Sequence, residues 1–260
     1  MKKTVIALGL ILIFSANARC ATVTGGVSKA DVNCGANQIV DNATNMPVAN
    51  AKVSMPKLGY YTVTDDEGRF NLATIQNATI LSVEKEGYRP FSLTVNQMAN
   101  SKPIVLGIQK SDMFDVVIES DMMHLGDDNY SPSSANAGYF QLQSKGPSYS
   151  KQFVMKSSVL NKNNYLVIGS ILGIDTLLAR SMGQNKIVNA YSSPPEVYFN
   201  GTKIAEIQLN GDNQKIKLPN RLIKANAANE ITIKTGRNLM QRAYIDYDDI
   251  EIANLSIMTE

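Results

Sequence analysis

The chain has 260 residues, of which 44% are hydrophobic and 18% charged, with 2 cysteines, 1 histidine and no tryptophan. This apolar fraction is enough for one or two ordinary cores, which excludes a disordered chain, a collagen-like chain and a disulfide-dense scaffold. Of the 25 basic residues, Lys2 and Lys3 lie in a segment that we expect to be removed, and the remaining 23 equal the 23 acidic residues. A neutral chain does not attract a polyanion, so we expect no nucleic-acid partner.

Residues 1–18 have the features of a secretory signal peptide. Two lysines are followed by an apolar run at 5–14 and by the small-residue cleavage pattern Ala-Asn-Ala at 16–18. The apolar run is half of the about 20 residues that a membrane-spanning helix needs. We therefore expect a mature chain without a transmembrane segment, exported to the periplasm or to the outside of a bacterial cell.

The two cysteines, Cys20 and Cys34, form the only pair available for an intrachain disulfide in an oxidising compartment. Cys20 also raises the alternative of a lipid-modified N-terminus, but Arg19 occupies a position where such signals carry a small residue. Two cysteines and one histidine do not supply the usual four-ligand zinc site.

Residues 19–108 are expected to form a first domain of short β-strands. Apolar and polar residues alternate with period two, and no segment shows the 3.6-residue period of a helix. The expected strands are 39–40, 51–53, 60–63, 80–83 and 92–95. Residues 64–70 (Thr-Asp-Asp-Glu-Gly-Arg-Phe) predict a tight turn, because aspartates accept hydrogen bonds from nearby backbone N–H groups and Gly68 tolerates positive φ.

Several residues of this segment follow a family pattern. They are Val40, Asp41, Thr44, Pro47, Ala51 and Val53, the turn 64–70, Val83, and Glu86-Gly87-Tyr88. In these positions the chain resembles the carboxypeptidase regulatory-like domain, a transthyretin-like β-sandwich. The resemblance implies a non-catalytic scaffold. The peptidase that such domains accompany needs several zinc-binding histidines, and this chain has one.

Residues 112–260 are expected to form a larger β domain after a linker at 107–111. The expected early strands are 114–118, 139–142, 149–155 and 165–168. Asn-Gly pairs at 200–201 and 210–211 predict hairpin turns, because both central residues of that turn favour positive φ. One helical turn is compatible with the sequence around 177–178.

The alternation of apolar and polar residues shifts by one position within the last strand-like segment, residues 250–257. Ile250 and Ile252 alternate with polar residues, and Leu255 and Ile257 resume the alternation on the opposite phase. A β-bulge near 253–254 would keep all four side chains on one face.

Three pieces of the second domain follow another family pattern. They are 197–201 with Ile204, then 218–219 and 222–223 leading to 229–233, and finally 248–255. In these pieces the chain resembles the galactose-binding-like jelly roll, a β-sandwich that includes many carbohydrate-binding modules. We therefore expect an all-β protein of two β-sandwich domains in series.

The catalytic inventory is small. The sequence has no serine elbow and no phosphate-binding glycine loop with lysine. An imidazole titrates near neutral pH, so His124 is a candidate general base, but beside Met122, Met123 and Leu125 we expect it to be structural or to lie at the rim of a site.

The expected ligand site is the polar loop that follows this histidine. It comprises Asp127, Asp128, Asn129 and Tyr130, with His124 at its start. Amide, carboxylate and aromatic groups of this kind hold neutral sugars.

The resemblance to the jelly-roll family also implies a structural calcium at the sandwich edge, with Glu119, Asp249 and Glu251 as its expected ligands. The alternative is that the acids near 248–251 form a plain polar face. The acidic residues 65–67 could likewise be a calcium loop, but we interpret them as a solvated hairpin tip.

The leading functional hypothesis is an exported, non-catalytic protein that recognises a carbohydrate and requires no cofactor. The second hypothesis is a structural or protein-interaction module of the cell envelope, which would bind another envelope protein through a sheet edge. The third is a polysaccharide lyase or glycosidase, whose paired carboxylates any fold could bring together.

Overall fold

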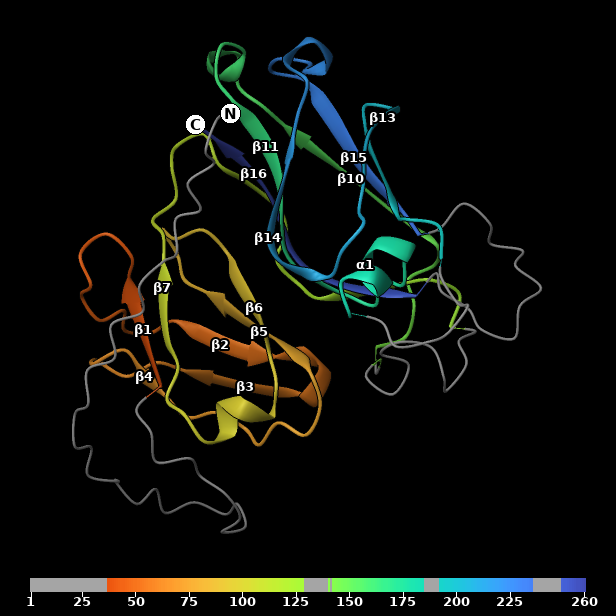
Figure 1. Cartoon of the computed structure of the whole chain (residues 1–260). Coiled ribbons are helices and arrows are strands. Elements are labelled where there is room, and N and C mark those ends of the chain that lie inside the picture. The colour runs from red at the N-terminus through yellow and green to blue at the C-terminus, as the bar shows by residue number, and fades with distance from the viewer. Residues whose placement is uncertain (1–36, 129–139, 141, 185–191, 236–248) are drawn as a thin grey trace, which may run out of the picture.

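The computed structural model describes residues 37–128, 140, 142–184, 192–235 and 249–260. The expected signal peptide, Cys20, Cys34, Asn129 and Tyr130 lie outside the described residues. Within the described part, strands dominate and form four sheets, which confirms the all-β prediction (Figure 1). No helix among the described residues is long and apolar enough to cross a membrane.

The first domain is a sandwich of two sheets. One sheet has the strand order β4-β1-β7 and the other β3-β2-β5-β6. The strands are β1 (Asn37–Asp41), β2 (Lys52–Met55), β3 (Tyr60–Val63), β4 (Arg69–Phe70), β5 (Thr79–Glu84), β6 (Phe91–Val95) and β7 (Val105–Ile108), with 3₁₀ turns η1 (Pro56–Leu58) and η2 (Gln97–Asn100). Apolar side chains from both sheets, among them Ile39, Val53, Leu81 and Leu106, meet in one core.

The predicted turn at 64–70 is confirmed, and its chemistry is the expected one. Asp65 Oδ1 accepts hydrogen bonds from the backbone N–H groups of Glu67 and Arg69. Gly68 has φ +70°, and a Cβ there would lie 2.4 Å from the Ile39 carbonyl oxygen. The flanking strands β3 and β4 belong to different sheets, so the turn connects the two layers and is not a hairpin tip.

The second domain also consists of two sheets around one core. One has the order β10-β15-β12-β13, and the other β14-β11-β16-β8, with β9 also paired to β16. The strands are β8 (Val116–Glu119), β9 (Met123–Leu125), β10 (Ser148–Val154), β11 (Asn164–Leu172), β12 (Glu196–Phe199), β13 (Thr202–Glu206), β14 (Gly211–Lys217), β15 (Ala228–Lys234) and β16 (Ile250–Thr259). The turns η4 (Ser157–Val159) and η5 (Asn220–Leu222) and the helix α1 (Leu177–Ser181) connect them.

The two Asn-Gly predictions have different outcomes. Asn200 and Gly201 have φ of +50° and +78° and join the antiparallel pair β12 and β13, as expected. The hairpin prediction at 210–211 is wrong, because β13 pairs with β12 whereas β14 pairs with β11 in the facing sheet. Gly211 instead supplies φ +148° where the chain crosses between the layers.

Three smaller predictions can also be compared. The helical turn near 177–178 is confirmed as α1. The expected linker at 107–111 begins too early, because Gly107 and Ile108 belong to β7. β9 was not predicted as a strand, because three residues are too short to show an alternation of apolar and polar side chains.

The phase change in β16 is confirmed. Ile250, Ile252, Leu255 and Ile257 all pack in the core of the second domain, and Asn254 between them has φ +58°. The register between β16 and β8 shifts between Leu255 and Ser256. The other face of β16 is buried as well, because the first domain covers it.

Candidate functional site

The two sandwiches meet along the outer face of the sheet β14-β11-β16-β8. β6 of the first domain approaches this face, and both the backbone N–H and the hydroxyl of Thr94 donate to Asp212 Oδ1, at 3.0 and 2.9 Å. Asn254 Nδ2 donates to Ser82 Oγ across the same interface. A Cβ on Gly169 would lie 2.4 Å from Ser92 Oγ, so the glycine permits the close approach.

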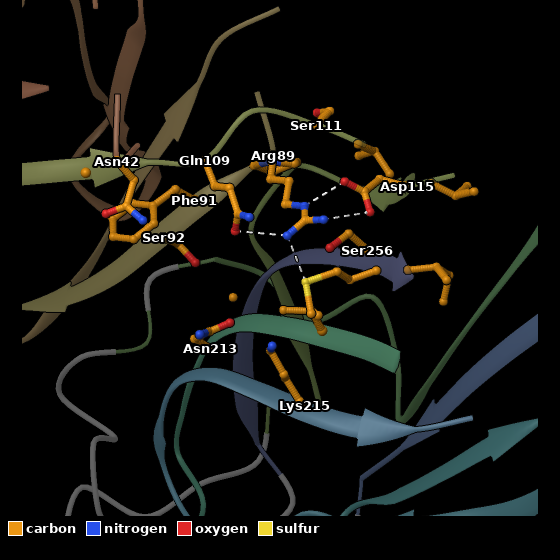
Figure 2. Close-up of a pocket in the computed structure, with 18 residues that line it drawn as sticks. Asn42, Arg89, Phe91, Ser92, Gln109, Ser111, Asp115, Asn213, Lys215 and Ser256 are labelled. Carbon is orange, nitrogen blue, oxygen red and sulfur yellow. Dashed lines mark hydrogen bonds and ion pairs between the residues drawn. The ribbon is translucent and has the colours of Figure 1, made fainter. Parts of the chain in front are cut away.

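A recess of about 280 Å³ opens at this interface (Figure 2). The second domain contributes alternate, outward-facing residues of neighbouring strands, and the first domain contributes residues next to β6 and β7. The polar residues that line it are Asn42, Arg89, Ser92, Gln109, Ser111, Asp115, Asn213, Lys215 and Ser256. Aliphatic side chains of Val117, Val167 and Met258 lie among them. The recess is therefore made by both domains, with amides, hydroxyls and apolar surface side by side.

The guanidinium of Arg89 is fixed at the edge of the recess. Its Nε and Nη2 donate to the two carboxylate oxygens of Asp115, at 2.6 and 3.2 Å. Its Nη1 donates to Gln109 Oε1 at 2.9 Å and contacts the Met258 sulfur at 3.0 Å. A bidentate pair of this kind neutralises the charge and fixes the orientation of both side chains.

Ser92 presents an unsatisfied hydroxyl at the same recess. The residue is 4% exposed, and its Oγ has no hydrogen-bond partner within the part of the chain that the structure describes. A buried hydroxyl without a partner is unfavourable by about 1–3 kcal/mol, which makes it a marker for a missing partner.

A second cluster of polar residues lies where β9 pairs with β16, and we name it the charged cluster: Lys57, His124, Asp128, Asp249 and Glu251. His124 is 0% exposed. Its Nδ1 lies 2.6 Å from the Leu142 carbonyl oxygen and its Nε2 2.7 Å from Asp249 Oδ1. Because a carbonyl and a carboxylate both accept hydrogen bonds, this arrangement favours the imidazolium, in which both ring nitrogens donate.

The first domain supplies the other cation of the charged cluster. Lys57, in η1, is 3.4 Å from Glu251 Oε2, and the two side chains are 3% and 0% exposed. Phe140 stacks on His124 at 4.8 Å between ring centroids, and the Lys57 ammonium lies 5.9 Å from the centroid of the Phe140 ring. Asp128 Oδ1 is 3.5 Å from His124 Nδ1 and is the more exposed member.

Burial and pairing act in opposite directions on the two cations. Burial disfavours the charged imidazole, but the Asp249 carboxylate, the Leu142 carbonyl and the nearby Glu251 outweigh it and raise the pKa of His124 above its usual value. For Lys57 burial dominates, so its pKa is lowered even though Glu251 favours the charged form.

The first sandwich brings together the motif residues read from the sequence. Tyr88 donates its hydroxyl to Asp41 Oδ2 at 2.9 Å, and Asp41 Oδ1 accepts from the backbone N–H groups of Ala43 and Thr44.

Residues 37–118 match the CarboxypepD_reg-like domain. No curated protein matches the chain. The match spans the whole first sandwich, the linker and most of β8, so the CarboxypepD_reg-like domain is the part of the chain whose family is identified.

The acids expected to bind calcium do not converge. Glu119 accepts a hydrogen bond from the Tyr149 hydroxyl at 2.9 Å, Asp249 accepts from His124, and Glu251 pairs with Lys57 of the CarboxypepD_reg-like domain. Because calcium needs six to eight oxygens around one point, these residues do not fit a calcium site. In the charged cluster, His124 and Lys57 contact Asp249 and Glu251, and His124, Asp128 and Asp249 lie close enough together to hold a metal ion.

The predicted ligand loop joins the charged cluster at one point. Asp128 and His124 lie beside Asp249, which the sequence analysis had assigned to a different site. Asp127 is exposed at the surface. Lys57 could not be found from the sequence, because a lysine in a 3₁₀ turn gives no signal of a partner 194 residues away.

Proposed function

We propose that this protein is an exported, non-catalytic recognition protein whose ligand is a carbohydrate. The observation that carries the proposal is the burial of His124, whose two ring nitrogens are both bound inside the protein. The chain has no other histidine. A general base must reach its substrate, so this arrangement argues against His124 as a general base and in this respect favours recognition over histidine-based catalysis.

The carbohydrate class is supported by the recess between the two domains. Amide and hydroxyl groups next to aliphatic side chains match the two kinds of surface on a sugar ring, its hydroxyls and its C–H face. The second domain, which we propose to be galactose-binding-like, has two antiparallel sheets around one core. The proposal includes a mature chain that begins at residue 19, with a Cys20–Cys34 disulfide and no required cofactor.

A second candidate function is binding of another envelope protein. β3 is an edge strand, and its Tyr61 and Val63 are 73% and 51% exposed. An exposed apolar edge accepts an added strand from a partner.

A glycan array with the mature chain, residues 19–260, tests the first proposal against the second. We expect saturable binding to a defined glycan group that is unchanged by a chelator, since calcium does not fit the described acids. A blank array with a sample that circular dichroism shows to be folded would overturn the carbohydrate proposal and favour the protein partner.

A further inference from the structure

The floor of the interdomain recess is made by the outer face of one sheet. Alternate residues of three adjacent strands face it: Val167 and Gly169 on β11, Asn213 and Lys215 on β14, and Ser256 and Met258 on β16. Gly169 has no side chain, which lets Ser92 of the first domain approach this face closely. The floor is therefore shallow and mixed, with aliphatic surface beside hydrogen-bonding groups.

Two polar side chains at the recess have no hydrogen-bond partner among the described residues. Ser92 Oγ is buried and unpaired. The side chain of Asn213, on the floor, makes no hydrogen bond within that part of the chain either, and Figure 2 shows it facing the same opening as Arg89, Gln109 and Lys215. Asn213 has φ +52°, so its backbone conformation suits asparagine or glycine. These groups come from both domains and can hold one ligand between them.

The charges at the recess are already balanced. Arg89 is bound by both oxygens of Asp115, and Lys215 pairs with Glu260 at 2.9 Å. An anionic ligand would have to compete for these cations. A neutral ligand with several hydroxyls would not.

We propose that this recess binds one neutral sugar ring, with its C–H face on Val167 and Met258 and its hydroxyls paired with Ser92, Asn213 and Gln109. The proposal rests on the proposed carbohydrate recognition and adds the site and the kind of sugar. A volume of about 280 Å³ lies just below the roughly 300–1,000 Å³ of sites for drug-sized ligands, so it accommodates a single ring and not an oligosaccharide. The loop at 127–130 is then not the primary site.

The test is titration of the full mature chain with methyl glycosides of galactose, glucose, mannose and N-acetylglucosamine, and of glucuronate as the charged probe. We expect one neutral glycoside to bind, with an affinity that is the same at low and high salt. Glucuronate alone binding, and more weakly at high salt, would overturn the neutral-sugar assignment.

Two variants locate the site. Ser92→Ala should weaken binding by about tenfold, because a sugar hydroxyl loses its partner, while the thermal midpoint stays the same or rises, because an unpaired buried hydroxyl is removed. Asn213→Gly removes the amide and keeps a residue that tolerates positive φ, and it should also weaken binding about tenfold.

The matched control is Asn45→Gly, since Asn45 also has positive φ (+57°) but does not line the recess. It should leave binding unchanged. A positive glycan array with full binding by both recess variants would overturn this inference and leave the proposed function in place. Absence of binding by every glycoside on a chain that binds the array would equally exclude a single-ring site here.

Discussion

Replacing Lys57 by methionine should destabilise the protein far more than replacing an exposed lysine. At the observed 3.4 Å, the Coulomb attraction between the Lys57 and Glu251 charges is about 5 kcal/mol at an effective dielectric constant of 20. Desolvation of both charges offsets much of this attraction, so the pair contributes little compared with an apolar pair. Removing one partner alone is different, because the Glu251 carboxylate is then buried without its counter-ion, at a cost of about 3–5 kcal/mol.

The nearby His124 imidazolium compensates the charge of Glu251 in part. We therefore expect the unfolding free energy to fall by about 3 kcal/mol, the lower end of that range. Urea unfolding followed by circular dichroism measures it, since the chain has no tryptophan. With a slope of about 1–3 kcal/mol per molar urea, the midpoint should fall by about 1 M or more. The double variant Lys57→Met with Glu251→Gln should recover part of that loss, because no uncompensated charge remains.

The matched control is Lys52→Met. Lys52 pairs with Glu84 at 3.3 Å, nearly the same distance, but the side chains are 51% and 31% exposed. An exposed pair contributes about 0–1 kcal/mol, so the control should remain close to wild type. If Lys57→Met behaved like this control, or if the double variant lost the sum of the two single losses, the account of the charged cluster would be wrong.

Three further predictions concern the same interface. The pKa of His124 is raised in the folded state, so its pairing stabilises the protein fully below about pH 6.5, and this stabilisation is lost as the pH rises through the folded-state pKa. The difference in unfolding free energy between wild type and His124→Gln should therefore be larger near pH 5.5 than near pH 8.5. A difference that grows with pH would contradict the imidazolium. Gly169→Ala should lower stability by about 1–3 kcal/mol in urea unfolding, with partial recovery when Ser92→Ala is added, because the new Cβ lies 2.4 Å from Ser92 Oγ; no recovery would show that the contact is not the cause. Asn254→Ala should lose more stability than Asn254→Gly, by about 1 kcal/mol, because the position has φ +58°, and equal losses in thermal unfolding would show that only the bond to Ser82 matters.

The sequence was informative wherever a local rule decides the structure. The turn at 64–70 was predicted because Asp65 and Gly68 act on their immediate neighbours. The bulge in β16 was predicted because two pairs of isoleucine and leucine residues had to reach one core. Both depend on residues close in sequence.

The sequence was uninformative where a contact joins distant segments. The hairpin prediction at 210–211 failed because the strand pairing, and not the turn residues, decides which sheet β14 joins. The charged cluster was divided between two predicted sites because Lys57, His124 and Glu251 share no local pattern. The recess could not be predicted, since it exists only where two separately readable domains touch.

The position of β16 bears on how the second domain folds. This strand, at residues 250–259, pairs with β11, β8 and β9, so segments that precede it by up to 141 residues in the chain converge on it. Until β16 is in place, β11 lacks its central neighbour in the sheet, and β8 and β9 have no strand to pair with. Contacts of such long sequence separation slow folding, because loop-closure entropy is lost before they form. A central strand that comes last in the chain therefore keeps the second domain open until synthesis is nearly complete, which is compatible with the export that we propose.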